Sequence, residues 1–197
     1  QLKFKVQELQ HLKMQIHPHF LFNTLNTLYG FALKKSDQTP EMILKLSNLL
    51  DYILYQTDKP KVSLIEEVNH IKDYISLEKM RFGDRLKVDF EAPLIPETTH
   101  IAPMLLLPFV ENSFKHGILK NGQLEIDIRL KLTNHNIDFY IDNTANTDNK
   151  DSSGIGLENI KRRLELIYKN EYDLDIKIEN EKFVVHLSLK TNQTLER

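Results

Sequence analysis

The sequence predicts an α+β protein in which helices come first and a mostly antiparallel sheet, covered on one face by helices, follows. Apolar residues recur at steps of three and four up to about residue 82, as amphipathic helices require. After Gly83, apolar and polar residues alternate in short runs, which is typical of strands. Turns rich in Asn, Asp and Pro separate these runs, and two more helical segments lie between them.

Composition limits the classes of function. The 197 residues are 41% hydrophobic and 27% charged with a formal net charge of -2, so bulk charge does not indicate direct binding to nucleic acid. The absence of cysteine excludes disulfides, thiolate metal sites and a cysteine nucleophile. We find no signal peptide and no apolar run long enough to span a membrane, so we expect no membrane contact within this sequence. Because Gln1 lies inside a helical pattern, we expect a fragment of a longer protein.

Three helices are expected in the first part. The first covers Gln1 to about Lys35 and is interrupted by Pro18, and the second covers about Glu41 to Gln56 after a turn at residues 36–40. Such a pair forms an antiparallel hairpin. A third helix is expected from Leu64 to Arg81, with Ser63 as its N-cap. The second helix should bury one face, made of Ile43, Leu46, Leu49, Leu50 and Ile53.

The second part carries the alternating segments. Two helices are expected there, at about Met104 to His116 and Gly156 to Tyr168. This division predicts a helical hairpin domain at 1–60, a helical connector at 61–84 and an α+β domain at 85–197. The expected strands are Leu86–Phe90, Leu124–Leu132, Ile137–Ile141, Asp173–Glu179 and Phe183–Leu189.

One segment of the first helix is chemically unusual. Its residues 17–23 read His-Pro-His-Phe-Leu-Phe-Asn, so two histidines, a proline and an asparagine interrupt an apolar helix. Proline costs about 3 kcal/mol in a helix interior, which suggests a requirement other than helix stability. A kinked core helix with a satisfied histidine would also explain the pattern. A metal site is disfavoured, because His17 and His19 point to different faces.

Two further segments favour a bound polyphosphate. In the helix ending at His116, Asn112, Lys115 and His116 share one face, which suits a magnesium-bound phosphate chain. Basic residues before a terminal glycine would equally suit an ordinary helix C-terminus. Gly154 and Gly156 enter the next helix and could offer backbone N–H groups to an anion, although a simple N-terminal turn fits as well.

Taken together and in this order, these segments resemble the LytS/YehU type of sensor histidine kinase. Residues 18–23 look like its Pro-His-Phe-Leu-Phe-Asn phosphoacceptor motif, and residues 62–67 and 74–86 resemble its connector. Residues 110–112 (Val-Glu-Asn) are similar to the N box of Bergerat-fold ATPases, and residues 154–164 to their G box. The resemblance implies a hairpin that forms a four-helix bundle in a homodimer, followed by a Bergerat-type α/β sandwich that binds ATP and Mg²⁺.

The resemblance also assigns roles. His19 would be the phosphoacceptor, with Asn23 one turn later orienting it. Phe20 follows His19 where many other histidine kinases have a carboxylate, so the resemblance assigns no general base. Glu111 is the candidate, because it is a carboxylate on the same helix as Asn112. Asn112 would hold Mg²⁺, while Lys115 and His116 would approach the phosphates. Asp142 matches the aspartate that meets the adenine amino group. The nucleotide would also be bound by the G-box residues Gly154, Gly156 and Leu157.

The implied function is autophosphorylation on His19 followed by transfer to an aspartate of a response regulator, possibly of LytTR type. A neutral imidazole suits this chemistry, since its unperturbed pKa is ~6.5. The parent would be membrane-anchored, with this portion in the cytoplasm. The motif after Asp142 reads Asn-Thr-Ala-Asn and lacks the family's two glycines. A degenerate kinase acting as a dimeric relay therefore remains an alternative, and a phosphohistidine-dependent ATPase-like enzyme is a third.

Overall fold

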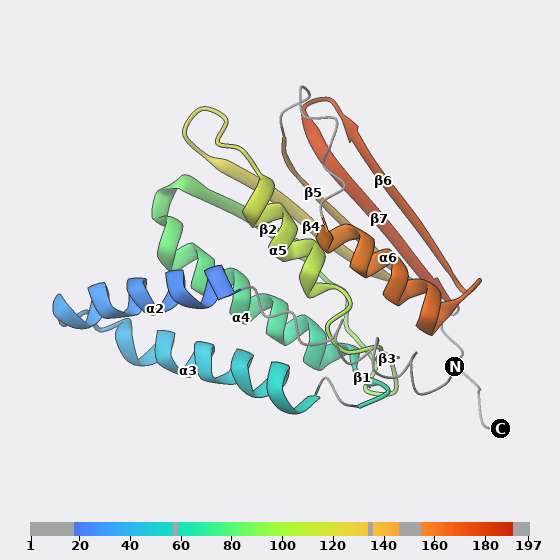
Figure 1. Cartoon of the computed structure of the whole chain (residues 1–197), viewed down its shortest axis with the longest axis horizontal. Coiled ribbons are helices and arrows are strands. Elements are labelled where there is room, and N and C mark those ends of the chain that lie inside the picture. Colours follow the sequence, from blue (N-terminus) through green and yellow to red (C-terminus); the bar gives the residue numbers. More distant parts are fainter. Residues whose placement is uncertain (1–17, 57–58, 134–135, 146–154, 191–197) are drawn as a thin grey trace.

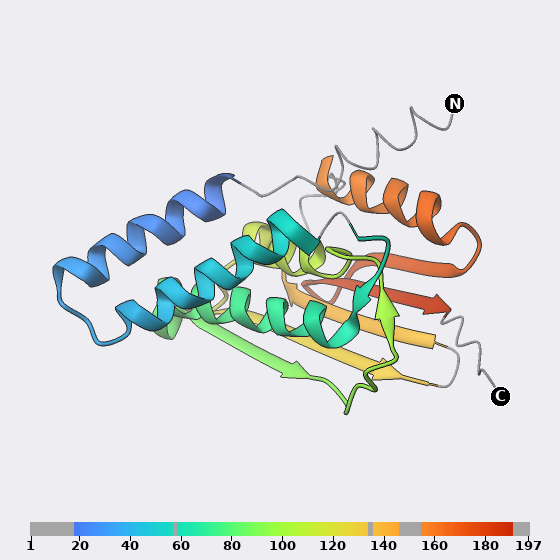
Figure 2. The ribbon, with the colours of Figure 1, turned by 90° about the horizontal axis from the view of Figure 1, so that it is seen from below.

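The computed structural model describes residues 18–56, 59–133, 136–145 and 155–190. Helices α2 (Pro18–Leu33) and α3 (Thr39–Asp51) form an antiparallel hairpin, and a π-helical turn, η1 (Tyr52–Gln56), continues α3. The predicted hairpin is therefore confirmed. The part of the predicted first helix that precedes Pro18 lies outside the described residues. Helix α4 (Leu64–Phe82) lies beside the hairpin, between it and the sheet (Figures 1 and 2).

The buried face of α3 differs from the prediction at one position. Met42, Leu46 and Leu49 are buried and Ile53 continues this stripe, whereas Ile43 is 51% exposed. Steps of four, three and four keep the buried residues on one side of the helix, and Ile43 is turned by about 100° from Met42. The prediction that Ile43 faces inward is wrong.

The sheet has five strands in the order β2-β4-β5-β7-β6, and only β2 and β4 run parallel. It is thus mostly antiparallel, as predicted. Helices α5 (Leu107–His116) and α6 (Ile155–Tyr168) lie over one face of it (Figure 1). The strands are β2 (Leu86–Glu91), β4 (Leu124–Leu132), β5 (Asn136–Thr144), β6 (Tyr172–Glu179) and β7 (Lys182–Lys190).

The entry into α4 is held by a short ribbon that the sequence did not predict. Strand β1 (Val62–Ser63) pairs with β3 (His100–Ile101), and two-residue strands are too short to show an alternating pattern. Ser63 is the N-cap of α4, as predicted, and its hydroxyl accepts a hydrogen bond from the Ile65 N–H at 3.2 Å. A 3₁₀ turn, η2 (Gly83–Arg85), connects α4 to β2, and Gly83 has φ 58° there.

A carboxylate explains why α5 begins later than predicted. Glu67 of α4 is fully buried and accepts hydrogen bonds from the backbone N–H groups of Met104, Leu105 and Leu106 at 2.9 to 3.0 Å, and from the Tyr52 hydroxyl. Met104 has φ 55°, which is incompatible with a right-handed helix. The predicted start at Met104 is therefore wrong, and regular helix begins at Leu107. Among the described residues, no helix is both long and apolar enough to cross a membrane.

Candidate functional site

His19 lies in the first turn of α2, on a segment that is anchored by its neighbour. Phe20 is buried and its ring stacks on Tyr74 of α4 with centroids 4.5 Å apart, whereas His19 is exposed. One turn later, the amide nitrogen of Asn23 lies 3.3 Å from Nδ1 and 3.2 Å from Nε2 of His19. A side-chain amide can donate to the unprotonated nitrogen of a neutral imidazole. Asn23 therefore contacts the His19 ring, and its orienting role stays a prediction.

His19 also lines a cavity of about 360 Å³ where α2, α4 and α5 meet. The cavity combines aromatic walls with two carboxyl groups and two cations. It therefore brings the predicted phosphoacceptor next to the helix that carries Asn112. Its lining residues are His19, Phe20, Tyr74, Glu78, Arg81, Glu111, Phe114 and Lys115.

Both carboxyl groups of this cavity are buried. Glu78 is 2% exposed and Glu111 is 6% exposed. Burial raises the pKa of Glu78 to about 7, although the Arg81 guanidinium and the Tyr74 hydroxyl act in the opposite direction. Burial and the nearby Glu78 raise the pKa of Glu111 to about 8, against the effect of Lys115. Glu111 therefore holds its proton at neutral pH.

The polar face of α5 was predicted to bind phosphate and Mg²⁺. Asn112 is partly exposed there, and Lys115 and His116 are exposed in the last turn. Desolvation and the neighbouring Lys115 cation lower the pKa of His116, so its ring is mainly neutral at pH 7. Among the residues that the structure describes, no three His, Asp or Glu side chains converge into a metal cage. One amide ligand with phosphate oxygens and water would be an arrangement that suits Mg²⁺.

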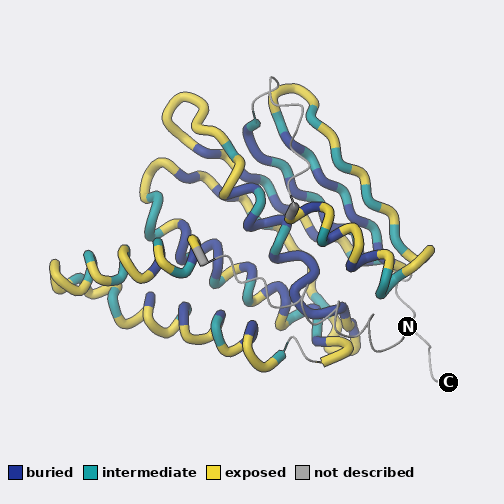
Figure 3. Tube along the Cα trace, in the orientation of Figure 1, coloured by how far each residue is buried: buried dark blue, intermediate teal, exposed yellow. Residues whose placement is uncertain are grey.

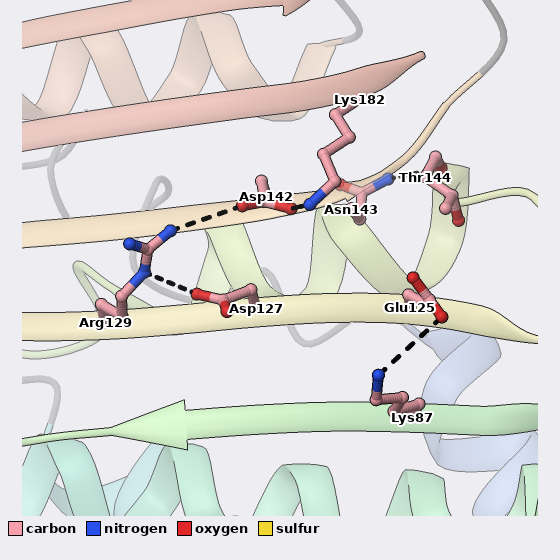
Figure 4. Close-up of polar contacts among 8 residues, drawn as sticks. All are labelled: Lys87, Glu125, Asp127, Arg129, Asp142, Asn143, Thr144 and Lys182. Atoms are coloured by element: carbon pink, nitrogen blue, oxygen red, sulfur yellow. Dashed lines mark hydrogen bonds and ion pairs between the residues drawn. The ribbon is translucent and has the colours of Figure 1, made fainter. Parts of the chain in front are cut away.

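Strand β5 places Asp142 and Asn143 on opposite faces of the sheet. Asp142 lies on the outer face, where its Oδ1 is 2.6 Å from the Lys182 ammonium and its Oδ2 is 3.7 Å from Arg129, which also pairs with Asp127 (Figure 4). Asn143 lies on the helix-covered face, like Phe139 and Ile141. The structure therefore does not bring Asp142 to the side on which α5 and α6 lie.

Asn143 has an unsatisfied polar atom at that inner face. The residue is 2% exposed, its amide nitrogen donates to the Thr144 carbonyl at 2.9 Å, and its Oδ1 is buried without a hydrogen-bond partner. Gly117, which ends α5, lies against it, because a Cβ there would be 3.3 Å from the Asn143 amide nitrogen and 2.4 Å from Leu124 Cδ1. Gly117 is therefore packed directly against Leu124 and Asn143, where a side chain would not fit.

The G-box residues are only partly described. Gly154 lies outside the described residues, Gly156 is exposed in the first turn of α6, and Leu157 is buried. The buried guanidinium of Arg163 donates to the Met104 carbonyl at 2.6 Å and to the Pro103 carbonyl. Helix α6 is therefore attached to the segment that Glu67 holds from the other side.

Sequence reasoning missed Glu78 and Asn143, although each left a signal. Glu78 continues the spacing of the buried α4 residues Ile71, Tyr74 and Ile75, so a carboxyl group stands at a core position. Asn143 follows Ile141 by two residues and so belongs to the buried face of β5. A charged or amide side chain in phase with a core stripe is the pattern that could have identified both.

Comparison with known proteins places the chain in a family. Residues 7–86 match the family described as Histidine kinase. The sensor histidine kinase YpdA of Escherichia coli (strain K12) is 33% identical over 174 residues, which are 82% of this chain and 30% of YpdA. The chain belongs to the histidine kinase family. The sensor protein kinase HptS of Staphylococcus aureus (strain USA300) is 29% identical over 184 residues, which cover 86% of this chain and 35% of HptS.

This histidine kinase chain spans about a third of the length of these curated relatives. Solved structures share its fold at low identity. The histidine kinase domain of the blue-light activated kinase from Erythrobacter litoralis EL346 has a TM-score of 0.53 and 13% identity, covering 95% of both chains. The catalytic domain of histidine kinase ThkA has a TM-score of 0.51 and 11% identity, over 66% of this chain and 95% of that one. The predicted α+β fold with a Bergerat-type domain is confirmed.

Proposed function

We propose that this chain is the catalytic core of a sensor histidine kinase, which uses ATP to phosphorylate its own His19 and then passes the phosphoryl group to an aspartate of a response regulator. The observation that supports this most directly is the shared cavity, in which His19 of α2 meets Glu111 and Lys115 of α5. The helix with the predicted Mg²⁺ ligand thus lies next to the predicted phosphoacceptor.

The proposed ATP site lies between α5, α6 and the inner face of β5. Asn112 would ligate Mg²⁺, Lys115 and His116 would bind the phosphates, and the α6 N-terminus at Gly154, Gly156 and Leu157 would complete the site. The resemblance gave the adenine contact to Asp142, but the geometry supports Asn143. Its orphaned Oδ1 can accept a hydrogen bond from an exocyclic amine.

Phosphoryl transfer mainly requires positioning and neutralisation of charge. Asn23 would fix the imidazole ring of His19, and stacking of Phe20 on Tyr74 would fix the helix turn that carries it. Lys115 would neutralise charge on the phosphate that reaches this cavity. Residues 1–60, 61–84 and 85–197 would serve as the phosphoacceptor hairpin, the connector and the ATP-binding domain.

A second copy of the chain is the proposed partner of the hairpin. Figure 3 shows that much of α2 is exposed. On this helix, four large apolar residues recur at steps of three and four and are 44% to 66% exposed: Phe22, Leu25, Tyr29 and Leu33. An exposed apolar stripe on a helix usually marks an interface. Pairing two hairpins into a four-helix bundle would cover it. The longer parent would be anchored in a membrane, with this core in the cytoplasm and a response regulator of LytTR type as its substrate.

The test is autophosphorylation with γ-labelled ATP and Mg²⁺ on the unmodified chain, His19→Gln and the control His100→Gln, whose exposed imidazole lies on β3. We expect acid-labile, alkali-stable label on the unmodified chain and the control, and none on His19→Gln. Label that survives in His19→Gln would move the acceptor elsewhere. ATP binding without any label would instead support the dimeric relay, which the altered motif after Asp142 favours.

A further inference from the structure

The cavity that His19 lines also contains two carboxyl groups and two cationic side chains, which positioning of a histidine does not require. From α2 it is faced by His19, from α4 by Tyr74, Glu78 and Arg81, and from α5 by Glu111 and Lys115. Both carboxyl groups are almost fully removed from water. Ionised carboxylates in such a place are costly, and two that are close together do not readily ionise at the same time.

The two carboxyl groups are not equivalent. The Arg81 guanidinium nitrogen Nη2 is 2.6 Å from Glu78 Oε2, one turn away on the same helix. Lys115, one turn beyond Glu111, is exposed and shares its charge with solvent. The Arg81 guanidinium at this distance favours the ionised form of Glu78. Glu78 is therefore the carboxyl group of this cavity that is best placed to act as a carboxylate.

We propose that Glu78, and not Glu111, accepts the proton that His19 gives up when it is phosphorylated, and that Arg81 holds the Glu78 carboxylate in its ionised form. This inference rests on the proposed kinase function. One ring nitrogen of His19 forms the bond to the γ-phosphorus, while the bond from that phosphorus to the bridging oxygen breaks and ADP leaves with the electron pair. The proton on the other ring nitrogen passes to the Glu78 carboxylate, which leaves a neutral phosphoimidazole.

Burial of Glu78 is difficult to explain by packing alone. The other buried α4 residues near it are Tyr74, Ile75 and Leu77, and an apolar side chain would complete that face at less desolvation cost. A carboxylate with a pKa near the working pH is, by contrast, what general base catalysis requires. Glu78 and His19 line the same cavity, so the proposed proton transfer would explain why a carboxyl group is buried at this position.

The first experiment compares autophosphorylation rates of the unmodified chain, Glu78→Gln, Glu111→Gln and the control Glu66→Gln, which is exposed on the same helix. Loss of a general base typically lowers a rate by about 100-fold or more. We expect a loss of this size in Glu78→Gln, with the Kd for ATP changed less than about twofold and the rate in the control near that of the unmodified chain. Glu111→Gln should lose clearly less than Glu78→Gln.

The pH profile separates a base from a structural group. In the unmodified chain we expect the rate to contain a rising limb with its midpoint near pH 7, which should be missing in Glu78→Gln. Glu78→Asp, which keeps a carboxylate, should recover part of the rate and the limb. This comparison stays informative if Glu78→Gln unfolds, because the limb near pH 7 can then still be followed in the unmodified chain and in Glu78→Asp.

The two ways of failing can be told apart. If the unmodified chain takes up no label, the proposed kinase function fails and the inference fails with it. If the unmodified chain is labelled on His19 while Glu78→Gln is labelled equally fast, only the inference is overturned. A large loss in Glu111→Gln with little loss in Glu78→Gln would also overturn it and give the base role to Glu111.

Discussion

Helix α4 buries two glutamates about three turns apart, and their surroundings differ. Glu67 is surrounded by donors, because three backbone N–H groups and the Tyr52 hydroxyl bind its two oxygens. Glu78 lines a cavity and forms an ion pair with Arg81, and a second buried carboxyl group, Glu111, lines the same cavity. The difference shows that burial alone does not make a carboxyl group reactive. A carboxylate that is saturated with donors clamps the fold, whereas one with few donors remains available for a proton.

Removing the buried Glu67 carboxylate, which clamps the backbone of residues 104–106, should have the largest effect on stability. Replacing Glu67 by Ala would leave three buried N–H groups without an acceptor and would remove the countercharge near the buried Arg163. We expect the free energy of unfolding to fall by about 3 to 5 kcal/mol. In thermal unfolding this corresponds to a Tm lower by roughly 10 °C for a chain of this size. Glu66→Ala, exposed and adjacent, should change the Tm little, and a similar loss in both variants would contradict the clamp.

The carboxyl pair should give an intermediate effect, visible as a dependence of stability on pH. The raised pKa values mean that the folded chain still holds protons that the unfolded chain has released between about pH 4.5 and 8. The free energy of unfolding therefore falls as pH rises through this window. Glu111 has the larger pKa shift of the two, so it contributes the larger part of this pH dependence. Between pH 6 and 9, the free energy of unfolding of Glu111→Gln should therefore fall by about 2 kcal/mol less than that of the unmodified chain.

Denaturant titrations of the unmodified chain and Glu111→Gln at both pH values measure this difference. The control is Glu125→Gln, which changes an exposed carboxylate on the outer face of the sheet. It should leave the slope with pH unchanged. If the unmodified chain were as stable at pH 9 as at pH 6, its buried carboxyl groups would not hold their protons, and the distinction between Glu67 and the pair would fail.

Features that depend on residues close together in the sequence could be predicted, whereas features that depend on contacts between distant residues could not. Helix α4 and strand β4 were predicted within one residue, because their periodic patterns are local. The start of α5 was missed because Glu67, 37 residues before Met104, binds the N–H groups that a helix would use. The same limit applies to the site. His19 and the polar face of α5 stand out as motifs, whereas the role of Glu78 depends on a cavity between three helices.

The adenine contact shows a similar limit at the scale of one residue. Motif matching chose Asp142, but the alternation of a strand turns successive side chains to opposite faces. Asp142 has two cationic partners on the outer face, while Asn143 presents an unpartnered oxygen to the inner one. This pair repeats the contrast between Glu67 and Glu78, because the satisfied group supports the sheet and the unsatisfied group is available to a ligand.

The smallest predicted effect tests that contrast at β5. Asn143→Leu replaces a buried, unsatisfied amide by an apolar side chain of similar size, so the chain without nucleotide should become more stable by about 0.5 to 1 kcal/mol. The same change removes the proposed adenine acceptor and should raise the Kd for ATP about tenfold, which corresponds to about 1.4 kcal/mol. Asp142→Asn is the matched control. It should change the Kd less than about twofold, because the outer face does not reach the proposed nucleotide site.

Thermal unfolding without nucleotide and calorimetric titration with ATP measure the two quantities separately. If Asn143→Leu gains stability and binds ATP more weakly, the amide serves binding and not stability. Replacing a purely structural amide would instead lower both stability and ATP affinity, or change neither. Weaker binding in Asp142→Asn with normal binding in Asn143→Leu would return the adenine contact to Asp142. The strand would then have to rotate when nucleotide binds, because Asp142 is held on the outer face by Lys182 and Arg129 in this structure.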